Sequence, residues 1–374
     1  MNKILITLLA LMTAMPAVAK TYDKDYFGET TIHKAVFEDT LIHLARHNEL
    51  GFVELRAANP ELDPWIPGAG AKIILPKKHI LPDAPREGIV INLSEMRLFY
   101  FKDAGKAPIT YPISIGREGL STPQGTTSIV RKKDGPTWRP TPRMREEDPE
   151  LPEAVGPGPD NPLGTHAMYL GWPQYLIHGT NKPYGIGRRV SSGCIRMYPE
   201  SIKALFPQVP VGTKVTVVDQ AIKVGWIDDK MFIEVHPNQE QSLAIEENGV
   251  LKSYEVTADD MKRITKKAGQ YADRIDWEAV RDAVKNHSGF PVAVLDKNKE
   301  PGQSVKDELQ ALLEEAKLEE DEVLQAQEVK AVEAKAPDSH IYEESATPEK
   351  PATKPKVNKL NTKPARDTSM TFNN

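Results

Sequence analysis

The chain has 374 residues but only one cysteine, Cys194, so no disulfide can form within it. It lacks an excess of positive charge: 48 Lys and Arg residues stand against 53 Asp and Glu residues, a formal net charge of −5, which argues against nucleic acid as a partner. Beyond its start it also lacks any run of about 18 apolar residues, the length that a membrane-spanning helix needs. We therefore expect a soluble mature protein whose chemistry depends on a few specific residues.

The first residues have the pattern of a secretory signal peptide. A basic start at Lys3 is followed by an apolar stretch over residues 4–15 and by small residues at Ala17 and Ala19. The apolar stretch is too short for a comfortable membrane span. The absence of a cysteine near Ala19 argues against a lipid anchor. We therefore expect residues 1–19 to be cleaved off after Ala19 and the mature protein to be exported.

Residues 28–77 have the pattern of a small independent unit. Apolar spacing and a proline at the end of the second helix predict a strand, two helices and a strand, over residues 31–36, 40–45, 53–58 and 73–76. In residues 38–41, Leu55, 58–60 and 70–76 the unit resembles a LysM domain, the βααβ module that binds N-acetylglucosamine chains. The resemblance implies binding to glycan strands; the alternative is a small packing domain that has lost its ligand.

From residue 88 to 219, after a proline-marked link at 81–85, the pattern changes to short strands bounded by turn residues. The predicted strands cover residues 89–93, 97–101, 110–115, 126–131, 166–170 and 213–218. One helix, over residues 199–206, interrupts them, and residues 134–162 predict a long ordered loop or lid. The expected fold class is therefore mainly β, with a β-sandwich-like domain over residues 88–219.

Two further segments follow. Residues 227–294 predict a small α/β unit, with a strand at 231–236 and helices at 257–269 and 276–287 that Thr257 and Asp276 cap. Residues 299–374 are highly charged and poor in aromatic residues, so we expect a helical and largely disordered tail without a core of its own. This tail is a candidate docking segment for an unidentified protein.

Export makes the lone thiol of Cys194 informative, because cysteines in an oxidising compartment usually occur in pairs. The thiol is either inert and buried or reactive, and its neighbours favour the second interpretation. His178 lies 16 residues earlier, and the intervening glycine-containing loop can bring its imidazole to the thiol. Such a histidine either removes the thiol proton or forms a thiolate–imidazolium pair, and both give an activated nucleophile.

Two neighbours of Cys194 suit the same chemistry. Gly193 permits a tight turn and leaves the amides of Gly193 and Cys194 free to point at an oxyanion. Arg196 can return to the same face and hold a carboxylate or carbonyl group of a substrate. The alternative for Arg196 is a surface ion pair.

The segments around these residues, 177–181 and 190–197, closely resemble the catalytic motif of the L,D-transpeptidase family of the YkuD type. Further stretches resemble the Gram-negative periplasmic branch of that family: residues 88–92, 96–98, 116, 122–123, 135–138 and 156–164. The resemblance covers roughly residues 28–294 and implies a periplasmic location.

By this resemblance Cys194 is the nucleophile, His178 is the general base and acid, and the backbone carbonyl of Gly179 orients the imidazole. The resemblance also implies an oxyanion and substrate-binding group formed by Ser191, Ser192, Gly193 and Arg196. Ser192 stands where family members often have histidine. Because a hydroxyl does not titrate near neutrality, any role of that histidine in substrate contact or proton handling is in question here.

The implied reaction is acyl transfer in peptidoglycan, without a cofactor or a metal. Cys194 attacks the carbonyl of the third residue of a tetrapeptide stem, expected to be diaminopimelate, and releases D-Ala. The acceptor is an amine of a second stem, giving a 3→3 cross-link, or a lysine of an envelope lipoprotein. Water as acceptor makes the same site an L,D-carboxypeptidase or endopeptidase, and the active-site residues alone do not choose.

Other interpretations are open to test. One alternative is a non-enzymatic wall-binding protein that keeps the LysM-like unit but in which Cys194 has no catalytic role. Another is a papain-like or NlpC-type cysteine peptidase, but in those families the cysteine precedes the histidine in the sequence, the reverse of the order found here. A zinc site of His166, His178 and Cys194 matches no recurring ligand spacing. Three aromatic residues are candidates either for lining a cleft or for packing: Trp138, Trp172 and Tyr184.

Overall fold

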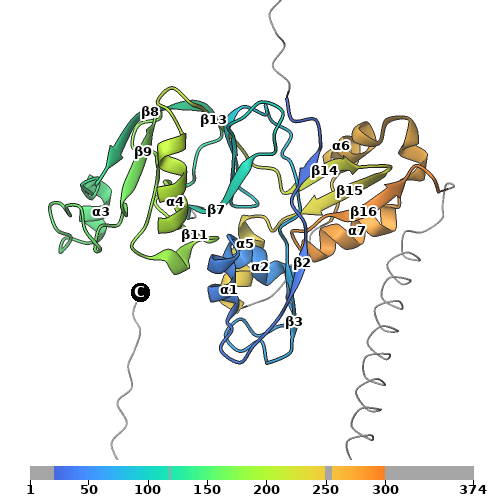
Figure 1. Ribbon diagram of the computed structural model, residues 1–374, viewed down its shortest axis with the longest axis horizontal. Helices are drawn as coiled ribbons and strands as arrows, with labels where there is room; N and C mark the ends of the chain where they lie inside the picture. The colour runs from blue at the N-terminus through green and yellow to red at the C-terminus, as the bar shows by residue number, and fades with distance from the viewer. Residues whose placement is uncertain (1–20, 118, 249–254, 300–374) are drawn as a thin grey trace, which may run out of the picture. The chain divides into compact units, whose positions relative to one another are not determined.

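The computed structural model describes residues 21–117, 119–248 and 255–299, so the expected signal peptide and nearly all of the expected tail lie outside the described residues. In the described part the fold is mainly β, as the sequence predicts (Figure 1). None of the helices in these residues is both long enough and apolar enough to cross a membrane.

The N-terminal region contains two small antiparallel sheets and two short helices. Its elements are β1 Tyr26–Phe27, β2 Thr31–Lys34, α1 Leu41–His47, α2 Phe52–Ala58, β3 Lys72–Leu75 and β4 His79–Ile80. β2 pairs with β3, and β1 with β4. The side chain of Thr40 caps α1 by accepting from the amide of His43, and α2 ends one residue before Asn59, as the following proline predicts. The order is therefore βααβ, and the assignment of this unit as a LysM domain stays a prediction.

Residues 88–219 form a nine-stranded sheet in the order β11-β7-β12-β10-β9-β8-β13-β5-β6. The strands are β5 Gly88–Asn92, β6 Arg97–Phe101, β7 Ile109–Gly116, β8 Gly125–Asp134, β9 His166–Leu170, β10 Leu176–His178, β11 Arg189–Ser191, β12 Ile195–Met197 and β13 Lys214–Val218. β7 is long enough to pair with β6 through residues 109–112 and with β12 through Ser114 and Ile113, which closes the sheet on itself. The two layers of the expected sandwich-like domain are therefore one continuous sheet around a shared core.

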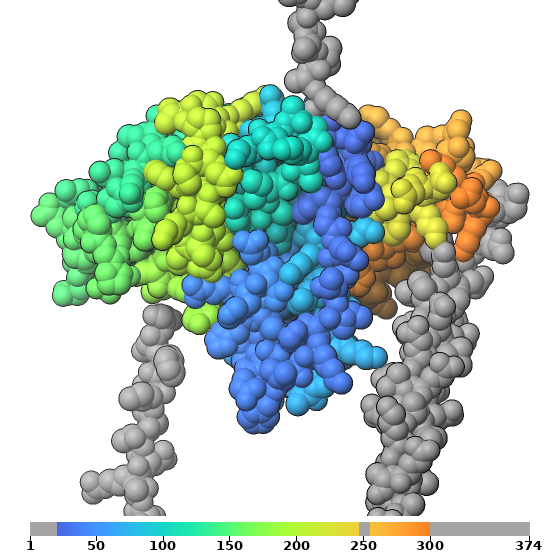
Figure 2. Space-filling view, viewed as in Figure 1, coloured from blue at the N-terminus to red at the C-terminus, as the bar shows by residue number. Residues whose placement is uncertain are grey.

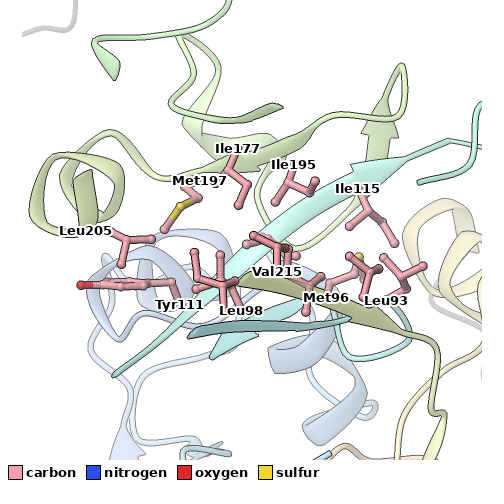
Figure 3. Packing of buried hydrophobic residues seen from close by; sticks show 14 of the residues in the cluster. Leu93, Met96, Leu98, Tyr111, Ile115, Ile177, Ile195, Met197, Leu205 and Val215 are labelled. Carbon is pink, nitrogen blue, oxygen red and sulfur yellow. The ribbon is translucent and has the colours of Figure 1, made fainter. Parts of the chain in front are cut away.

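That core is filled by aliphatic side chains from strands far apart in the sequence. Figure 3 shows buried side chains pointing toward one another, among them Ile115, Ile177, Ile195, Met197 and Val215 of the sheet and Leu205 of the helix Pro199–Leu205. All six are at most 1% exposed. Burying such side chains is worth about 1.5–3 kcal/mol each, so the core fixes the strands that carry the site.

Helices and short 3-10 turns connect some of the strands of this sheet. They are α3 Pro142–Glu147, η1 Pro183–Gly185, α4 Pro199–Leu205 and η2 Phe206–Gln208. α4 is the helix that the sequence predicts. α3 lies within the stretch expected to be a loop, because the side chain of Thr141 accepts from the amide of Met144 and Pro142 suits a first helical turn.

The C-terminal region contains the three-stranded sheet β14-β15-β16. Its elements are β14 Ile222–Ile227, β15 Lys230–Val235, α5 Gln239–Asn248, α6 Ala258–Ala268, η3 Gly269–Arg274, α7 Trp277–Asn286 and β16 Val292–Asp296. Thr257 and Asp276 cap α6 and α7, as predicted. β14 lies ahead of the expected start at 227, so this sheet begins earlier in the chain. α5, which the sequence pattern does not predict, contacts both α2 and β11.

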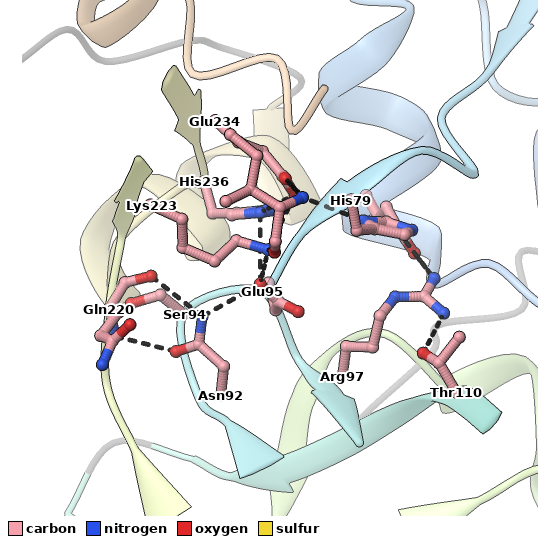
Figure 4. A network of polar contacts seen from close by, with 12 residues as sticks. His79, Asn92, Ser94, Glu95, Arg97, Thr110, Gln220, Lys223, Glu234 and His236 are labelled. Atoms are coloured by element: carbon pink, nitrogen blue, oxygen red, sulfur yellow. Dashed lines mark hydrogen bonds and ion pairs between the residues drawn. The ribbon is translucent and has the colours of Figure 1, made fainter. Parts of the chain in front are cut away.

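Buried charges join the three regions (Figure 4). Arg97 of β6 donates to both carboxylate oxygens of Glu54 on α2, at 2.8 and 2.7 Å. His79 lies 3.5 Å from Glu54 and 3.3 Å from Glu234 of β15, and Lys223 of β14 lies 2.9 Å from Glu234. Burial lowers the pKa of His79, with Arg97 acting in the same direction. The regions are therefore coupled by ion pairs that are shielded from water.

One part of this network has the composition of a metal site. Donor atoms of Glu95, Glu234 and His236 lie within 4.8 Å of one another. The ammonium group of Lys223 forms ion pairs with both carboxylates, and His236 lies 2.7 Å from Glu234. The positive charge that these carboxylates need is therefore supplied by a lysine.

Candidate active site

His178 and Cys194 lie at two adjacent parallel strands of the sheet, β10 and β12. His178 is the last residue of β10, and Cys194 directly precedes β12. The register places Ile177 opposite Ile195 and His178 opposite Arg196. The buried isoleucine pair fixes this register, since a shift by one residue turns an apolar side chain out of the core.

The thiol of Cys194 lies against the chain that enters β10. It donates to the carbonyl oxygen of Gln174 at 3.3 Å, and the sulfur accepts from the amide of Leu176. Burial raises the pKa of the Cys194 thiol, while the amide of Leu176 and the charge of Arg196 act in the opposite direction. The resting sulfur is therefore a protonated thiol at neutral pH, with two neighbours that favour the thiolate once it forms.

The imidazole of His178 is 3% exposed and held by the backbone. Its Nδ1 lies 2.6 Å from the carbonyl oxygen of Gly179. Because a carbonyl can only accept, Nδ1 carries the hydrogen and Nε2 keeps its lone pair. Burial, with Arg196 adding to it, lowers the pKa of His178 to about 3 against the opposing effect of the Gly179 and Leu163 carbonyls. The ring is therefore a neutral base, which favours proton removal over a preformed thiolate–imidazolium pair.

Hydrogen bonds fix the turn before Cys194. Ser191 Oγ donates to the carbonyl oxygen of Cys194 at 2.5 Å, and Thr122 Oγ1 donates to that of Gly193 at 2.9 Å. Gly193 has a φ of 102°, and a Cβ on it would lie 2.9 Å from the ring of Tyr175, so glycine is required here. The amide of Gly193 donates to Ser191 Oγ at 3.1 Å. It is therefore engaged in the turn, contrary to the expectation that it is free for an oxyanion.

Arg196 lies beside the dyad without a carboxylate partner. Within residues 21–117, 119–248 and 255–299 no acidic side chain forms an ion pair with it, and its buried Nε has no hydrogen-bond partner there. The alternative of a surface ion pair is therefore wrong for the described residues. An unpaired, partly buried guanidinium is suited to a negative charge on a substrate or on the sulfur.

A pocket of about 520 Å³ opens onto Cys194. Its lining includes Cys194 and four residues near it in the fold, Gln174, Tyr175, Leu176 and Ser192. It also includes residues of the segment that contains α3: Trp138, Arg139, Thr141, Arg143 and Met144. The expected lid segment therefore lines the pocket. Sequence analysis missed Gln174 and Tyr175, although both directly precede the strand that carries His178.

The remaining sequence candidates have other surroundings. The ring of His166 packs on that of Phe206, with centroids 4.6 Å apart, and its Nε2 lies 3.5 Å from Asp134. Trp138 lines the pocket, whereas Trp172 packs against the core. Tyr184 is 47% exposed and lies near Arg46 of α1. Of the three aromatic candidates, the structure thus places only Trp138 in the pocket.

The chain is similar in sequence to known proteins. A family model described as the L,D-transpeptidase catalytic domain, YkuD, matches residues 86–217. The chain is 41% identical over 258 residues to the probable L,D-transpeptidase YbiS of Escherichia coli K12, covering 67% of this chain and 82% of that protein. It is 38% identical over 300 residues to the probable L,D-transpeptidase YcfS of the same strain, covering 76% and 91%. It is 39% identical over 256 residues to the probable L,D-transpeptidase ErfK/SrfK of Salmonella typhimurium LT2, covering 67% and 80%.

Proposed function

The chain belongs to the L,D-transpeptidase family, and on that premise we propose that it is a periplasmic acyltransferase that uses Cys194 to remodel peptidoglycan. The observation that supports this proposal is the pairing of β10 with β12, the adjacent strands that carry His178 and lead out of Cys194, together with the backbone hydrogen bond that orients the neutral imidazole. A partly buried thiol with a base on the adjacent strand and an unpaired cation nearby fits acyl transfer better than an inert packing role.

The first half of the proposed reaction forms a thioester. Nε2 of His178 takes the thiol proton as the sulfur attacks the carbonyl carbon of the third stem residue, so a C–S bond forms and the carbonyl oxygen becomes an oxyanion. The C–N bond to the terminal D-Ala then breaks, and the His178 imidazolium returns its proton to the leaving amine. Arg196 favours the thiolate, and the amide of Cys194 is our candidate for the oxyanion donor, since that of Gly193 is engaged.

The second half consumes the thioester with an amine. The amine of another stem gives a 3→3 cross-link, and a lysine of an envelope lipoprotein gives an attached protein. Nε2 of His178 takes a proton from the attacking amine and returns it to the sulfur when the C–S bond breaks. Water in place of the amine gives hydrolysis, so the products distinguish a transferase from a hydrolase.

We also propose that residues 28–77 are a LysM domain that holds the enzyme on glycan strands. Two aromatic residues of this unit, Phe37 and Trp65, are 85% and 56% exposed. Aromatic faces of this kind stack on sugar rings, and an isolated packing domain has no need to expose them. Loss of sacculus binding in the double variant Phe37→Ala, Trp65→Ala, with D-Ala release from free stems retained, is the expected result; binding equal to that of the unaltered protein would contradict it.

The reaction is tested with defined muropeptides. The purified protein is incubated with disaccharide-tetrapeptides, with and without an amine acceptor, and the products are identified by mass. We expect D-Ala release and acceptor-dependent cross-linked products from the unaltered protein, and neither from Cys194→Ala. Unchanged products from Cys194→Ala would refute the proposal, and tripeptides alone in the presence of acceptor would favour a hydrolase.

A further inference from the structure

The N-terminus of α2 is seated on the loop that joins His178 to Cys194. The first amides of a helix have no partners within the helix. Here the amide of Phe52 donates to the carbonyl oxygen of Ile186 at 3.3 Å, and that of Val53 donates to the carbonyl oxygen of Gly187 at 3.2 Å. A helix of the N-terminal unit is thus capped by the backbone of the loop that leads to the nucleophile.

The two backbones are in direct contact at this point. A Cβ on Gly51 would lie 2.8 Å from Cα of Gly187, and one on Gly187 would lie 2.2 Å from Cα of Gly51. Next to them, the guanidinium of Arg188 lies 3.9 Å from the ring centre of Phe52. Figure 2 shows the blue N-terminal residues lying directly against the yellow-green part of the β domain. The contact is too close for any side chain other than hydrogen at either glycine.

Only a few residues, held by hydrogen bonds, separate this loop from the nucleophile. The loop continues into β11, which ends at Ser191. The carbonyl oxygen of Ser191 accepts from the amide of Arg117, and its Oγ bonds both the Gly193 amide and the Cys194 carbonyl. A displacement of the backbone at Gly187 is therefore expected to shift the turn that orients the thiol of Cys194.

The same unit also holds the chain after Cys194. β12 ends at Met197, and the hydroxyl of the next residue, Tyr198, donates to the carbonyl oxygen of Leu50 at 3.2 Å. Two residues further on, Glu200 accepts two hydrogen bonds from Arg46 of α1, at 2.8 and 3.0 Å. Both flanks of the nucleophile are therefore attached to the stretch 46–53.

That stretch is itself fixed to the β domain. The carboxylate of Glu54 accepts from the amide of Gly51 at 2.8 Å and from Arg97 of β6 at 2.7 Å. Glu54 and Arg97 are 6% and 2% exposed, so the link is not weakened by water. The N-terminal unit is thus bound to the β domain at Arg97 and contacts it again at the loop that contains Gly187.

We propose that the N-terminal unit is a positioning element of the active site, in which its contacts from Gly51 to Gly187 and from Leu50 to Tyr198 hold the two flanks of Cys194 in register with His178. The catalytic part of this inference rests on the proposed function, whereas the effect on the thiol does not. The unit then has a role in every turnover, in addition to any binding of glycan.

The test uses three variants of the full chain. Gly51→Ala adds a methyl group against Gly187 at a residue whose own φ of −82° suits alanine. Tyr198→Phe removes only the hydroxyl that bonds Leu50. The matched control is Gly185→Ala in the same loop, where a Cβ meets only a side-chain atom of Val190, at 3.6 Å. Thermal unfolding establishes which variants are folded.

Two readouts separate positioning from stability. The first is the rate of alkylation of Cys194 by iodoacetamide as a function of pH; with one cysteine in the chain, the reagent reports that thiol alone. The second is kcat and KM for D-Ala release. In folded Gly51→Ala we expect kcat to fall at least about tenfold with KM nearly unchanged, since small misplacement of reacting groups costs rate. We also expect the alkylation midpoint to move to lower pH, because a displaced turn exposes the thiol to water.

Tyr198→Phe is expected to show smaller changes of the same sign, and Gly185→Ala to match the unaltered protein in both readouts. Folded Gly51→Ala with an unchanged alkylation profile and an unchanged kcat would overturn the inference. If Gly51→Ala does not fold, Tyr198→Phe decides in the same way. Absence of D-Ala release from the unaltered protein, with a shifted alkylation midpoint in the variants, would remove the proposed function and leave the positioning inference standing.

Discussion

The acid side of the pH–rate profile depends on the state of His178. Attack by the thiol requires a neutral imidazole, and a histidine with an ordinary pKa of about 6.5 would be only about 3% neutral at pH 5. Burial lowers the pKa of His178 to about 3, so about 99% of the rings are neutral at pH 5. We therefore predict that kcat/KM for D-Ala release changes less than about twofold between pH 7 and pH 5, where an ordinary histidine would give a fall of about 25-fold.

The assay is the initial rate of D-Ala release at subsaturating tetrapeptide over pH 5–8, in buffers of constant ionic strength. Carboxylates of the donor keep their charge in this range, so an acid limb would report the enzyme. A limb with a midpoint near the ordinary pKa of histidine would refute the account of His178.

The same pKa shift affects stability, and the assay needs a folding control for that reason. Below about pH 6.5 the unfolded chain binds a proton at His178 that the folded protein, with its lower pKa, does not. Stability therefore falls as the pH decreases, by about 2 kcal/mol between pH 7 and pH 5 from this residue alone. The lowered pKa of buried His79 acts in the same direction. Urea unfolding at each pH shows whether the enzyme is still folded where its rate is measured.

Three further predictions concern stability, the turn and the nucleophile. Glu54→Gln breaks a buried ion pair and is expected to lower the free energy of unfolding by about 3–5 kcal/mol, whereas Glu200→Gln, at an exposed pair, lowers it by less than about 1 kcal/mol; urea unfolding measures both. Gly193→Ala strains a φ of 102° and meets Tyr175, so we expect a folded protein whose kcat falls about a hundredfold or more, measured as D-Ala release. A carbapenem is expected to add once to the intact protein and not to Cys194→Ala, as the family membership implies, measured by intact-protein mass spectrometry.

Each of these predictions has an outcome that counts against it. Equal destabilisation by Glu54→Gln and Glu200→Gln would show that burial does not set the strength of these pairs. Normal turnover by Gly193→Ala would show that the turn before Cys194 tolerates a side chain. A carbapenem adduct on Cys194→Ala would place the reactive group elsewhere.

The site was more predictable from the sequence than the way the regions are joined. The strand that ends at His178 and the strand that follows Cys194 each contain a buried isoleucine. Short apolar strands next to the single cysteine and its histidine are visible in the local sequence, so the site could be predicted from it. The order of the strands in the sheet has no such local signal, because the sheet is built by pairing distant segments, such as β5 with β13 and β7 with β12.

The buried charges were not predictable for a different reason. From the sequence alone, Glu54 is expected to be an exposed residue of a helix, and Arg97 and Lys223 are expected to be exposed residues of strands. Each is buried only because its partner comes from another region of the chain, 43 residues away for Glu54 and Arg97. The engagement of the Gly193 amide likewise depends on the rotamer of Ser191, which sequence spacing does not specify.

The central claim is that Cys194 carries the acyl group, and trapping that intermediate tests it most directly. The protein is mixed with a tetrapeptide stem whose acceptor amine is blocked, quenched in acid within one turnover, digested and mapped by mass. We predict a tripeptide acyl group on the peptide that contains Cys194, with one equivalent of D-Ala released. Release of D-Ala by Cys194→Ala, or an acyl group on any other residue, would contradict the account.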